Sequence, residues 1–226
     1  MRNLFLLCCL ALPLGLSGCA TAPPPHADYS QFRSENPHSI LVVPVTNKSV
    51  DVDAPNDFLS TISIPLAERG YYVFPVNAVK NTLAENGLSD ADLVSSGDPR
   101  RLAELFGADA VLYTSIERWD ARYAVLSTTV TVDLTYTLKS GRTGKTLWSN
   151  HQVFVYSPQA SNNSGGGLGG LIASLVIDAV QAAATKANPD YLPLARQANA
   201  NAIYRVGTGL PAGPYDGLYG KDGANF

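Results

Sequence analysis

The stretch TVTVDLTYTL, residues 129–138, decides the fold. Its apolar residues occupy every second position, and the positions between them hold threonine or aspartate. A period of two places successive side chains on opposite faces of a strand, whereas a helix needs a period of about 3.6 residues. We therefore expect an antiparallel strand with one face on the core and the other face open to water.

A partner strand follows directly. Gly141-Arg-Thr-Gly144 is typical of a tight turn, and residues 145–156 return along the first strand. The two segments predict an antiparallel hairpin in the C-terminal half of the chain. Because a hairpin alone is marginally stable in water, it needs further strands or helices to cover its apolar face.

Strands and helices alternate through the rest of the domain. Apolar runs rich in branched and aromatic residues predict strands at residues 39–45, 71–75 and 109–119. Helical spacing, capping residues and glycine stops predict helices around Phe58–Leu66, Val76–Leu83, Asp98–Phe106 and Arg196–Tyr204. This order predicts an α+β fold over residues 38–204, a single layer sandwich in which helices pack on a mixed sheet.

The N-terminus has the features of a lipoprotein signal peptide. Residues 1–18 contain Arg2 and an apolar run too short to span a bilayer core of about 30 Å. Leu16-Ser-Gly-Cys19 has the form of a bacterial lipobox, which predicts cleavage before Cys19 and acylation of its sulfur. Several acyl chains anchor a protein stably, whereas one chain does so only marginally. An ordinary signal peptide with an incidental cysteine is the alternative. By resemblance to Gram-negative sorting rules, Ala20 favours the outer membrane, with the domain in the periplasm.

Composition limits the classes of partner and cofactor. Residues 19–37 are predicted to form a flexible tether, because three consecutive prolines and many polar residues leave little to bury. The 226-residue chain has a formal net charge of −3, which argues against nucleic acid as a partner. Of its three cysteines, Cys8 and Cys9 leave with the signal and Cys19 takes the lipid. No disulfide, cysteine-bound metal or cofactor is therefore predicted.

No motif predicts a catalytic or metal site. Ser140–Thr146 (SGRTGKT) resembles part of a phosphate loop, but Lys139 stands where the first glycine is needed and a strand follows instead of a helix. The three histidines lack metal-ligand spacing, and His151 fits a strand face. Two acidic pairs lack the glycine and glutamate of a calcium loop: Asp51 with Asp53, and Asp90 with Asp92. A small hydrolase stays an alternative, because serine, histidine and acid can converge in space.

Two segments are candidate contact surfaces. Residues 168–187 predict a helix with apolar side chains around most of its circumference, typical of a buried core helix or of one that also packs on a second copy or another protein. The side chains expected at such a contact are Leu168, Leu171, Ile172, Leu175 and Val176. Residues 205–226 predict an irregular tail, in which Tyr215 and Tyr219 strap an edge of the domain or meet a partner. A disordered tail is the alternative.

Several of these stretches resemble one family of proteins. They are the lipobox, PLAERGYYVFPV at residues 65–76, FGADAVL at residues 106–112 and the glycine-rich turn into residues 168–187. In these the chain is similar to small outer-membrane lipoproteins of unknown function that include a meningococcal genome-derived antigen. The resemblance implies a fold like the TolB amino-terminal domain, a tendency to dimerise and gene neighbours like curli-channel lipoproteins. It supplies no catalytic residues.

Together these observations predict a non-enzymatic outer-membrane lipoprotein that serves as an accessory or scaffold in an envelope assembly or transport complex. The expected partners are the membrane, through lipid on Cys19, a second copy of the chain, and an envelope protein such as a curli-channel-like lipoprotein. An activator of peptidoglycan synthesis enzymes is the first alternative function, and a small periplasmic hydrolase is the second.

Overall fold

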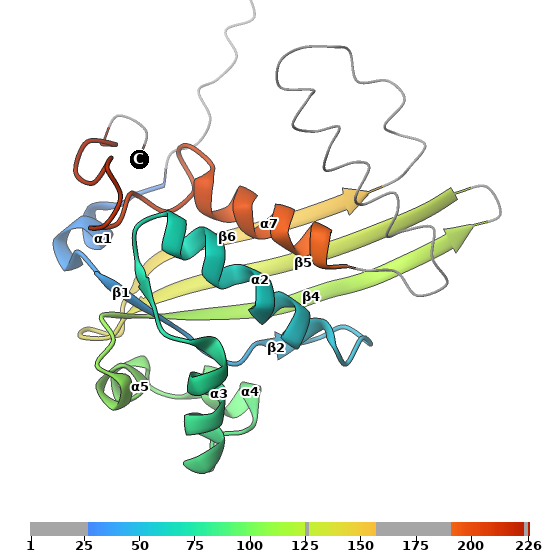
Figure 1. Ribbon diagram of the computed structural model, residues 1–226, viewed down its shortest axis with the longest axis horizontal. Coiled ribbons are helices and arrows are strands. Elements are labelled where there is room, and N and C mark those ends of the chain that lie inside the picture. The colour runs from blue at the N-terminus through green and yellow to red at the C-terminus, as the bar shows by residue number, and fades with distance from the viewer. Residues whose placement is uncertain (1–26, 125–126, 157–190, 224–225) are drawn as a thin grey trace, which may run out of the picture.

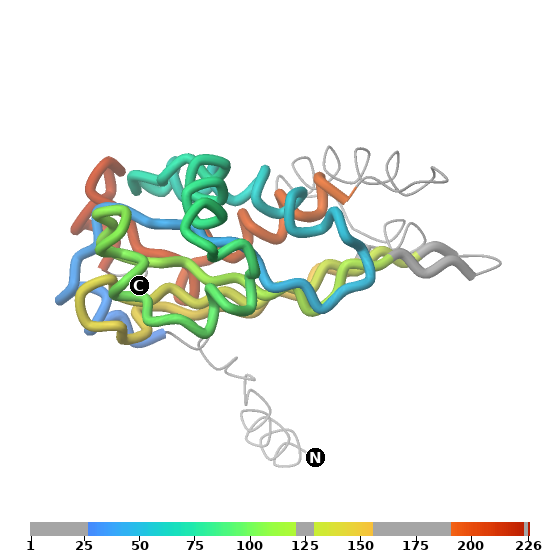
Figure 2. Tube along the Cα trace, turned by 90° about the horizontal axis from the view of Figure 1, so that it is seen from below, coloured from blue at the N-terminus to red at the C-terminus, as the bar shows by residue number. Residues whose placement is uncertain are grey.

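One mixed sheet organises the domain (Figure 1). The computed structural model describes most of the chain: residues 27–124, 127–156, 191–223 and 226. Strand β5 (Ser127–Ser140) pairs antiparallel with β4 (Ala110–Ala124) on one side and with β6 (Thr146–Tyr156) on the other. Figure 2 shows these three strands running together along the length of the domain. The predicted hairpin is confirmed, with Gly144 at the turn in a left-handed conformation (φ +74°) that favours glycine.

The alternation in residues 129–138 has the predicted consequence. One face of β5 is buried, with at most 1% of each side chain exposed: Val130, Val132, Leu134, Tyr136 and Leu138. On the other face Asp133 and Thr135 are only partly buried. The period of two therefore separates a core face from a polar face, as a half-covered antiparallel strand requires.

The other half of the sheet is parallel. Strand β1 (Ser39–Val42) lies parallel to β3 (Tyr72–Val73) and to β4, and the short β2 (Thr46–Asn47) pairs parallel with β4 further along. The strand order is β3-β1-β4-β5-β6. Helical crossovers make parallel pairing available to β1, β3 and β4, whereas tight turns force the later strands to be antiparallel. The predicted α+β fold with a mixed sheet is thereby confirmed.

Helices lie on both faces of the sheet. On one face lie α2 (Ala54–Glu68) and α7 (Leu192–Tyr204), side by side in Figure 1. On the other face lie α3 (Val76–Glu85), α4 (Ala91–Ser96) and α5 (Pro99–Phe106). Alternate residues of β1 serve the two cores, because Ile40 packs with the α2 and α7 side chains and Leu41 with those of α3, α4 and α5.

A chain of buried polar groups joins the first core to its helices. The Tyr136 hydroxyl on β5 donates to Asn199 Oδ1 on α7 at 2.6 Å, and Asn199 Nδ2 donates to Thr61 Oγ1 on α2 at 2.9 Å. The Thr61 hydroxyl donates in turn to the carbonyl of Phe58 at 2.8 Å. All three polar side chains are at most 1% exposed, so each hydrogen bond satisfies a group that would be costly to bury alone.

Helix ends follow local sequence rules in part. Asp98 caps α5 by accepting from the main chain of Arg100, and Gly107 ends it at φ +70°, as predicted. Helix α4 is an addition to the predicted elements, and Asp90, one of the paired aspartates, is its N-cap and accepts from the main chain of Leu93 at 2.9 Å.

The predicted tether of residues 19–37 is wrong over its described part. Residues 1–26 lie outside the described residues, but α1 (Ser30–Glu35) is a helix, and Tyr29 and Phe32 are at most 5% exposed in the first core. Two aromatic rings supply enough apolar surface to fix this segment, despite its polar and proline-rich composition. The domain therefore includes the described residues 27–37 and does not begin at residue 38.

Candidate interaction site

The C-terminal segment, Gly207–Gly223 with Phe226, folds back on the domain. It contains turns but no helix or strand among its described residues. The main-chain N–H of Gly213 donates to the carbonyl of Arg69 at 2.8 Å, and that of Tyr215 donates to the carbonyl of Gly70 at 3.0 Å. Gly70 itself has φ +85°, and a β-carbon there would overlap the main chain of Asp216. The segment is therefore fixed at the end of α2.

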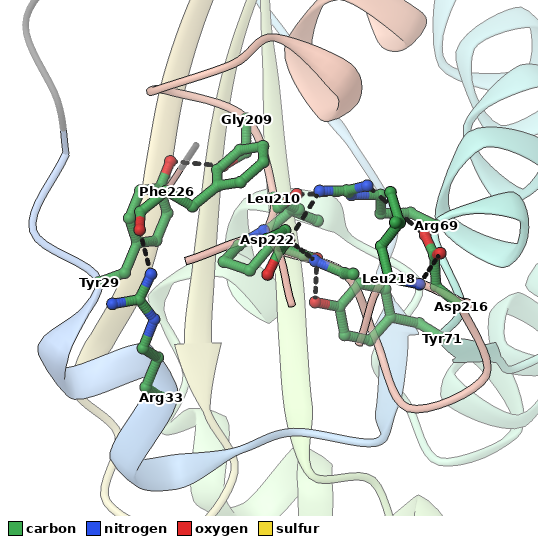
Figure 3. Close-up of polar contacts among 12 residues, drawn as sticks. Tyr29, Arg33, Arg69, Tyr71, Gly209, Leu210, Asp216, Leu218, Asp222 and Phe226 are labelled. Carbon is green, nitrogen blue, oxygen red and sulfur yellow. Dashed lines mark hydrogen bonds and ion pairs between the residues drawn. The ribbon is translucent and has the colours of Figure 1, made fainter. Parts of the chain in front are cut away.

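Arg69 binds this segment through its guanidinium group (Figure 3). Its Nε donates to the carbonyl of Leu210 at 2.7 Å, and its Nη2 donates to Asp222 Oδ2 at 3.1 Å. A longer contact of 3.5 Å joins Nη1 to Asp216 Oδ2. The guanidinium carbon also lies 5.0 Å from the centre of the Phe226 ring, a cation–π geometry.

The central ion pair is buried. The side chains of Arg69 and Asp222 are 10% and 8% exposed, and Asp222 Oδ2 also accepts from the main-chain N–H of Ala212 at 2.6 Å. A buried pair gains little net stability over an apolar one, but loss of one partner leaves an uncompensated charge. Loss of either partner is therefore expected to destabilise the domain, although the intact pair adds little net free energy.

Tyr29, which precedes α1, and Arg33, within α1, also bind the C-terminal segment, which is thereby clamped between α1 and the end of α2. The Tyr29 hydroxyl donates to the carbonyl of Gly209 at 2.6 Å, and burial raises the pKa of Tyr29 to about 12. Its ring packs edge-on against Phe226 with centroids 5.6 Å apart. Arg33 Nη2 donates to the main-chain carbonyl of Phe226. In the same way Tyr71 donates to the carbonyl of Pro211 at 2.7 Å, and burial raises the pKa of that hydroxyl well above its usual value.

A groove of about 560 Å³ opens between α1 and the C-terminal segment. Phe32, Arg33 and Asn36 line one side, and Tyr219 and Asp222 line the other. Its walls therefore combine aromatic rings, an arginine and a carboxylate. The Tyr219 hydroxyl donates to Asn36 Oδ1 at 2.7 Å across this boundary.

The outer side of the segment presents apolar and aromatic surface. Tyr215 is 75% exposed, Leu218 is 54% exposed and Tyr219 is 39% exposed. Arg69 and Gly70 fix the main chain that carries these side chains, so the segment is already in position before any partner binds. Preorganised aromatic side chains are what a protein contact needs, since little entropy is then lost on binding.

The structure describes only part of the predicted site set. Tyr215 and Tyr219 lie on the C-terminal segment, where both are accessible. Cys19 lies outside the described residues, and so do the predicted contact side chains of the apolar helix: Leu168, Leu171, Ile172, Leu175 and Val176.

The remaining sequence motifs lie in the sheet and its hairpin turn. SGRTGKT spans the end of β5, the hairpin turn and the start of β6. His151 Nε2 lies 2.7 Å from Asp133 Oδ1 on the open face of the sheet. Within the described ranges, no three His, Cys, Asp or Glu side chains are grouped so that they could hold a metal ion. Over the same ranges, the structure has no helix with the length and apolar character needed to span a membrane.

The residues that hold the site together are not predictable from the sequence. Arg69 and Asp222 are 153 positions apart, and Tyr29 and Gly209 are 180 apart. No periodicity or local motif links such positions. Each of these residues is of a type that is common on protein surfaces, so only the folded chain shows that they meet.

Comparison with known proteins identifies relatives. The family model described as "Putative lipoprotein GNA1162-like" matches residues 27–215. The protein "Putative lipoprotein NMB1124/NMB1162" of Neisseria meningitidis serogroup B is 39% identical over 171 residues, which are 76% of this chain and 78% of the relative. The crystal structure of lipoprotein GNA1162 from Neisseria meningitidis is similar at a TM-score of 0.53 and 38% identity, over 65% of this chain and 99% of that one.

A more distant likeness is to the PelC dodecamer from Paraburkholderia phytofirmans. It has a TM-score of 0.38 and 19% identity, over 70% of this chain and 86% of that one. A likeness of this size gives no ground for transferring the dodecameric assembly. The family match covers nearly all of the described domain, and the sequence identity extends over most of the chain. The chain therefore belongs to the GNA1162-like lipoprotein family.

Proposed function

We propose that this lipoprotein is a non-enzymatic accessory or scaffold protein, anchored in the outer membrane through lipid on Cys19 and acting in a periplasmic envelope assembly or transport complex. The observation that carries the proposal is the clamped C-terminal segment. The segment presents Tyr215, Leu218 and Tyr219 on a main chain that the buried ion pair of Arg69 and Asp222 holds in place. Exposed apolar side chains on a rigid support favour contact with another protein.

The anchor is tested by replacing Cys19 with serine. We expect the wild-type chain to fractionate with outer membranes and to partition into detergent, and the Cys19→Ser chain to do neither. A variant that still partitions into detergent contradicts the anchor, because a single uncharged side-chain change removes only the acylated sulfur.

The contact surface is tested by photo-crosslinking in living cells. A photoreactive residue is placed at Leu218 and, as a matched control, at Leu93 on α4, which is 53% exposed against 54% for Leu218. We expect a discrete adduct with an envelope protein, identified by mass spectrometry, from position 218 and not from position 93. Adduct formation should require Cys19. Equal labelling from both positions contradicts a specific contact surface.

The apolar residues 168–187 form a second proposed contact surface, toward a second copy of the chain. Replacing Leu175 with aspartate should lower the molar mass measured by light scattering while the circular dichroism spectrum is retained. An unchanged mass, or loss of the folded spectrum, contradicts this contact.

A further inference from the structure

The beginning of the described chain is fixed to the domain. The main-chain N–H of Ala27 donates to the carbonyl of Gly207 at 2.9 Å, and the Tyr29 hydroxyl holds Gly209. Ala27 and Asp28 also line a small hollow together with Thr146 and Trp148 at the start of β6. The point at which the chain leaves the domain is therefore defined, and it lies beside α1 and the first residues of β6.

This attachment shortens the link to Cys19. Whatever its conformation, a chain spans at most about 3.3–3.6 Å per residue, so the eight residues from Cys19 to Ala27 reach no further than about 29 Å. A tether running to residue 37 would reach about 65 Å by the same rule. The helix α1 therefore halves the distance that the domain can move away from an anchored Cys19.

We propose that the surface around Ala27, formed by α1, the start of β6 and the Gly207–Gly209 turn, faces the lipid bilayer and stays at headgroup level. This inference rests on the proposed lipid anchor. The occupant of the surface is the membrane itself, because a link of at most about 29 Å keeps the point where the chain leaves the domain near the anchored Cys19.

The chemistry of this surface agrees with a headgroup contact. Most of its exposed side chains are polar or charged: Asp28, Ser30, Arg33, Ser34, Lys145 and Thr146. One large apolar side chain beside this surface, Val206 next to the Gly207–Gly209 turn, is 57% exposed, whereas Val50 and Val52 before α2 and Val153 and Val155 on β6 belong to other parts of the domain. A surface of this kind rests against hydrated headgroups without entering the acyl region, whereas an inserting surface needs apolar side chains.

The test measures energy transfer from the domain to labelled lipid. Once Cys19 is acylated, the mature chain has no free thiol, so an introduced cysteine is the unique site for a donor dye. The two positions are Ser30→Cys on α1 and Ser96→Cys on α4, both exposed serines on elements that serve opposite cores. Each lipidated protein is reconstituted in vesicles of phosphatidylethanolamine and phosphatidylglycerol that carry a trace of rhodamine-labelled lipid.

We expect transfer from position 30 to exceed transfer from position 96 several-fold. Inserting a flexible Gly/Ser stretch as long as the existing link between residues 26 and 27 should lower transfer from position 30, because the domain can then move away. Equal transfer from both positions, or no change on lengthening, overturns the inference. Protein that fails to remain with the vesicles contradicts the lipid anchor itself, whereas retained protein with equal transfer contradicts only the orientation.

Discussion

Replacing Arg69 with methionine tests whether a buried ion pair fixes the C-terminal segment. Methionine keeps most of the side-chain length but removes the hydrogen bonds to Leu210 and Asp222. Among the described residues, the carboxylate of Asp222, 8% exposed, then keeps only the N–H of Ala212 as a hydrogen-bond donor. Removing one partner of a buried pair typically costs about 3–5 kcal/mol, because the other charge stays uncompensated.

The assay is urea unfolding followed by far-ultraviolet circular dichroism. With a urea m-value near the upper end of the usual range of about 1–3 kcal/mol/M, this loss lowers the unfolding midpoint by roughly 1–2 M. The matched control is Arg100→Met, because Arg100 pairs with Asp98 at 2.7 Å but is 60% exposed. That control should leave the midpoint unchanged within error, since exposed ion pairs are screened by water.

A second variant separates charge from packing. Asp222→Asn removes the charge but keeps an oxygen that can accept from Ala212, so the double variant Arg69→Met with Asp222→Asn should be more stable than Arg69→Met alone. Such non-additivity is the signature of direct coupling between two side chains. If the two single losses simply add, or if Arg69→Met behaves like Arg100→Met, the reasoning about the buried pair is refuted.

Three further changes test other parts of the domain by the same unfolding assay. Asn199→Ala leaves the buried Tyr136 hydroxyl without its acceptor, so we expect a loss of about 1–3 kcal/mol, and an unchanged midpoint would contradict this. Burial disfavours ionisation of Glu35, but hydrogen bonds from Thr143, Ser140 and Arg142 outweigh it and hold the Glu35 pKa below its usual value. The Glu35 contribution is therefore present above the unfolded pKa and lost as pH falls through the folded one, so the stability gap between wild type and Glu35→Gln should close below about pH 4. Gly141→Ala should cost about 1–3 kcal/mol, because its β-carbon would stand 2.5 Å from a β-carbon of α5, whereas Gly217→Ala, which meets nothing within 4 Å, should be neutral.

The sequence predicts those parts of the fold that depend on neighbours along the chain. The alternation in residues 129–138 is enough to orient β5, because each strand residue faces opposite to the next. Asp98 and Gly107 similarly mark both ends of α5, since capping involves groups within one turn. These elements could be placed before the fold was known.

Contacts between distant segments are not predictable in this way. Residues 27–37 have the composition of a tether, because polar residues and prolines outnumber the two aromatic residues Tyr29 and Phe32. Their burial depends on Tyr71 and Phe226, which pack against these rings from segments far away in the sequence. The candidate site has the same origin, because Arg69 needs carbonyl and carboxylate groups from the last part of the chain.

The two proposals meet at one place in the structure. The hydrogen bond from Ala27 to Gly207 joins the point where the lipid link enters the domain to the start of the C-terminal segment. Tyr219 on that segment in turn contacts Asn36 at the end of α1. A bilayer at the Ala27 surface therefore places the exposed aromatic side chains close to the membrane, so a partner that binds them must itself approach the bilayer. The photo-crosslinked protein is then expected to be membrane-embedded or lipid-anchored, and an adduct with a freely diffusing periplasmic protein would argue against the combined arrangement.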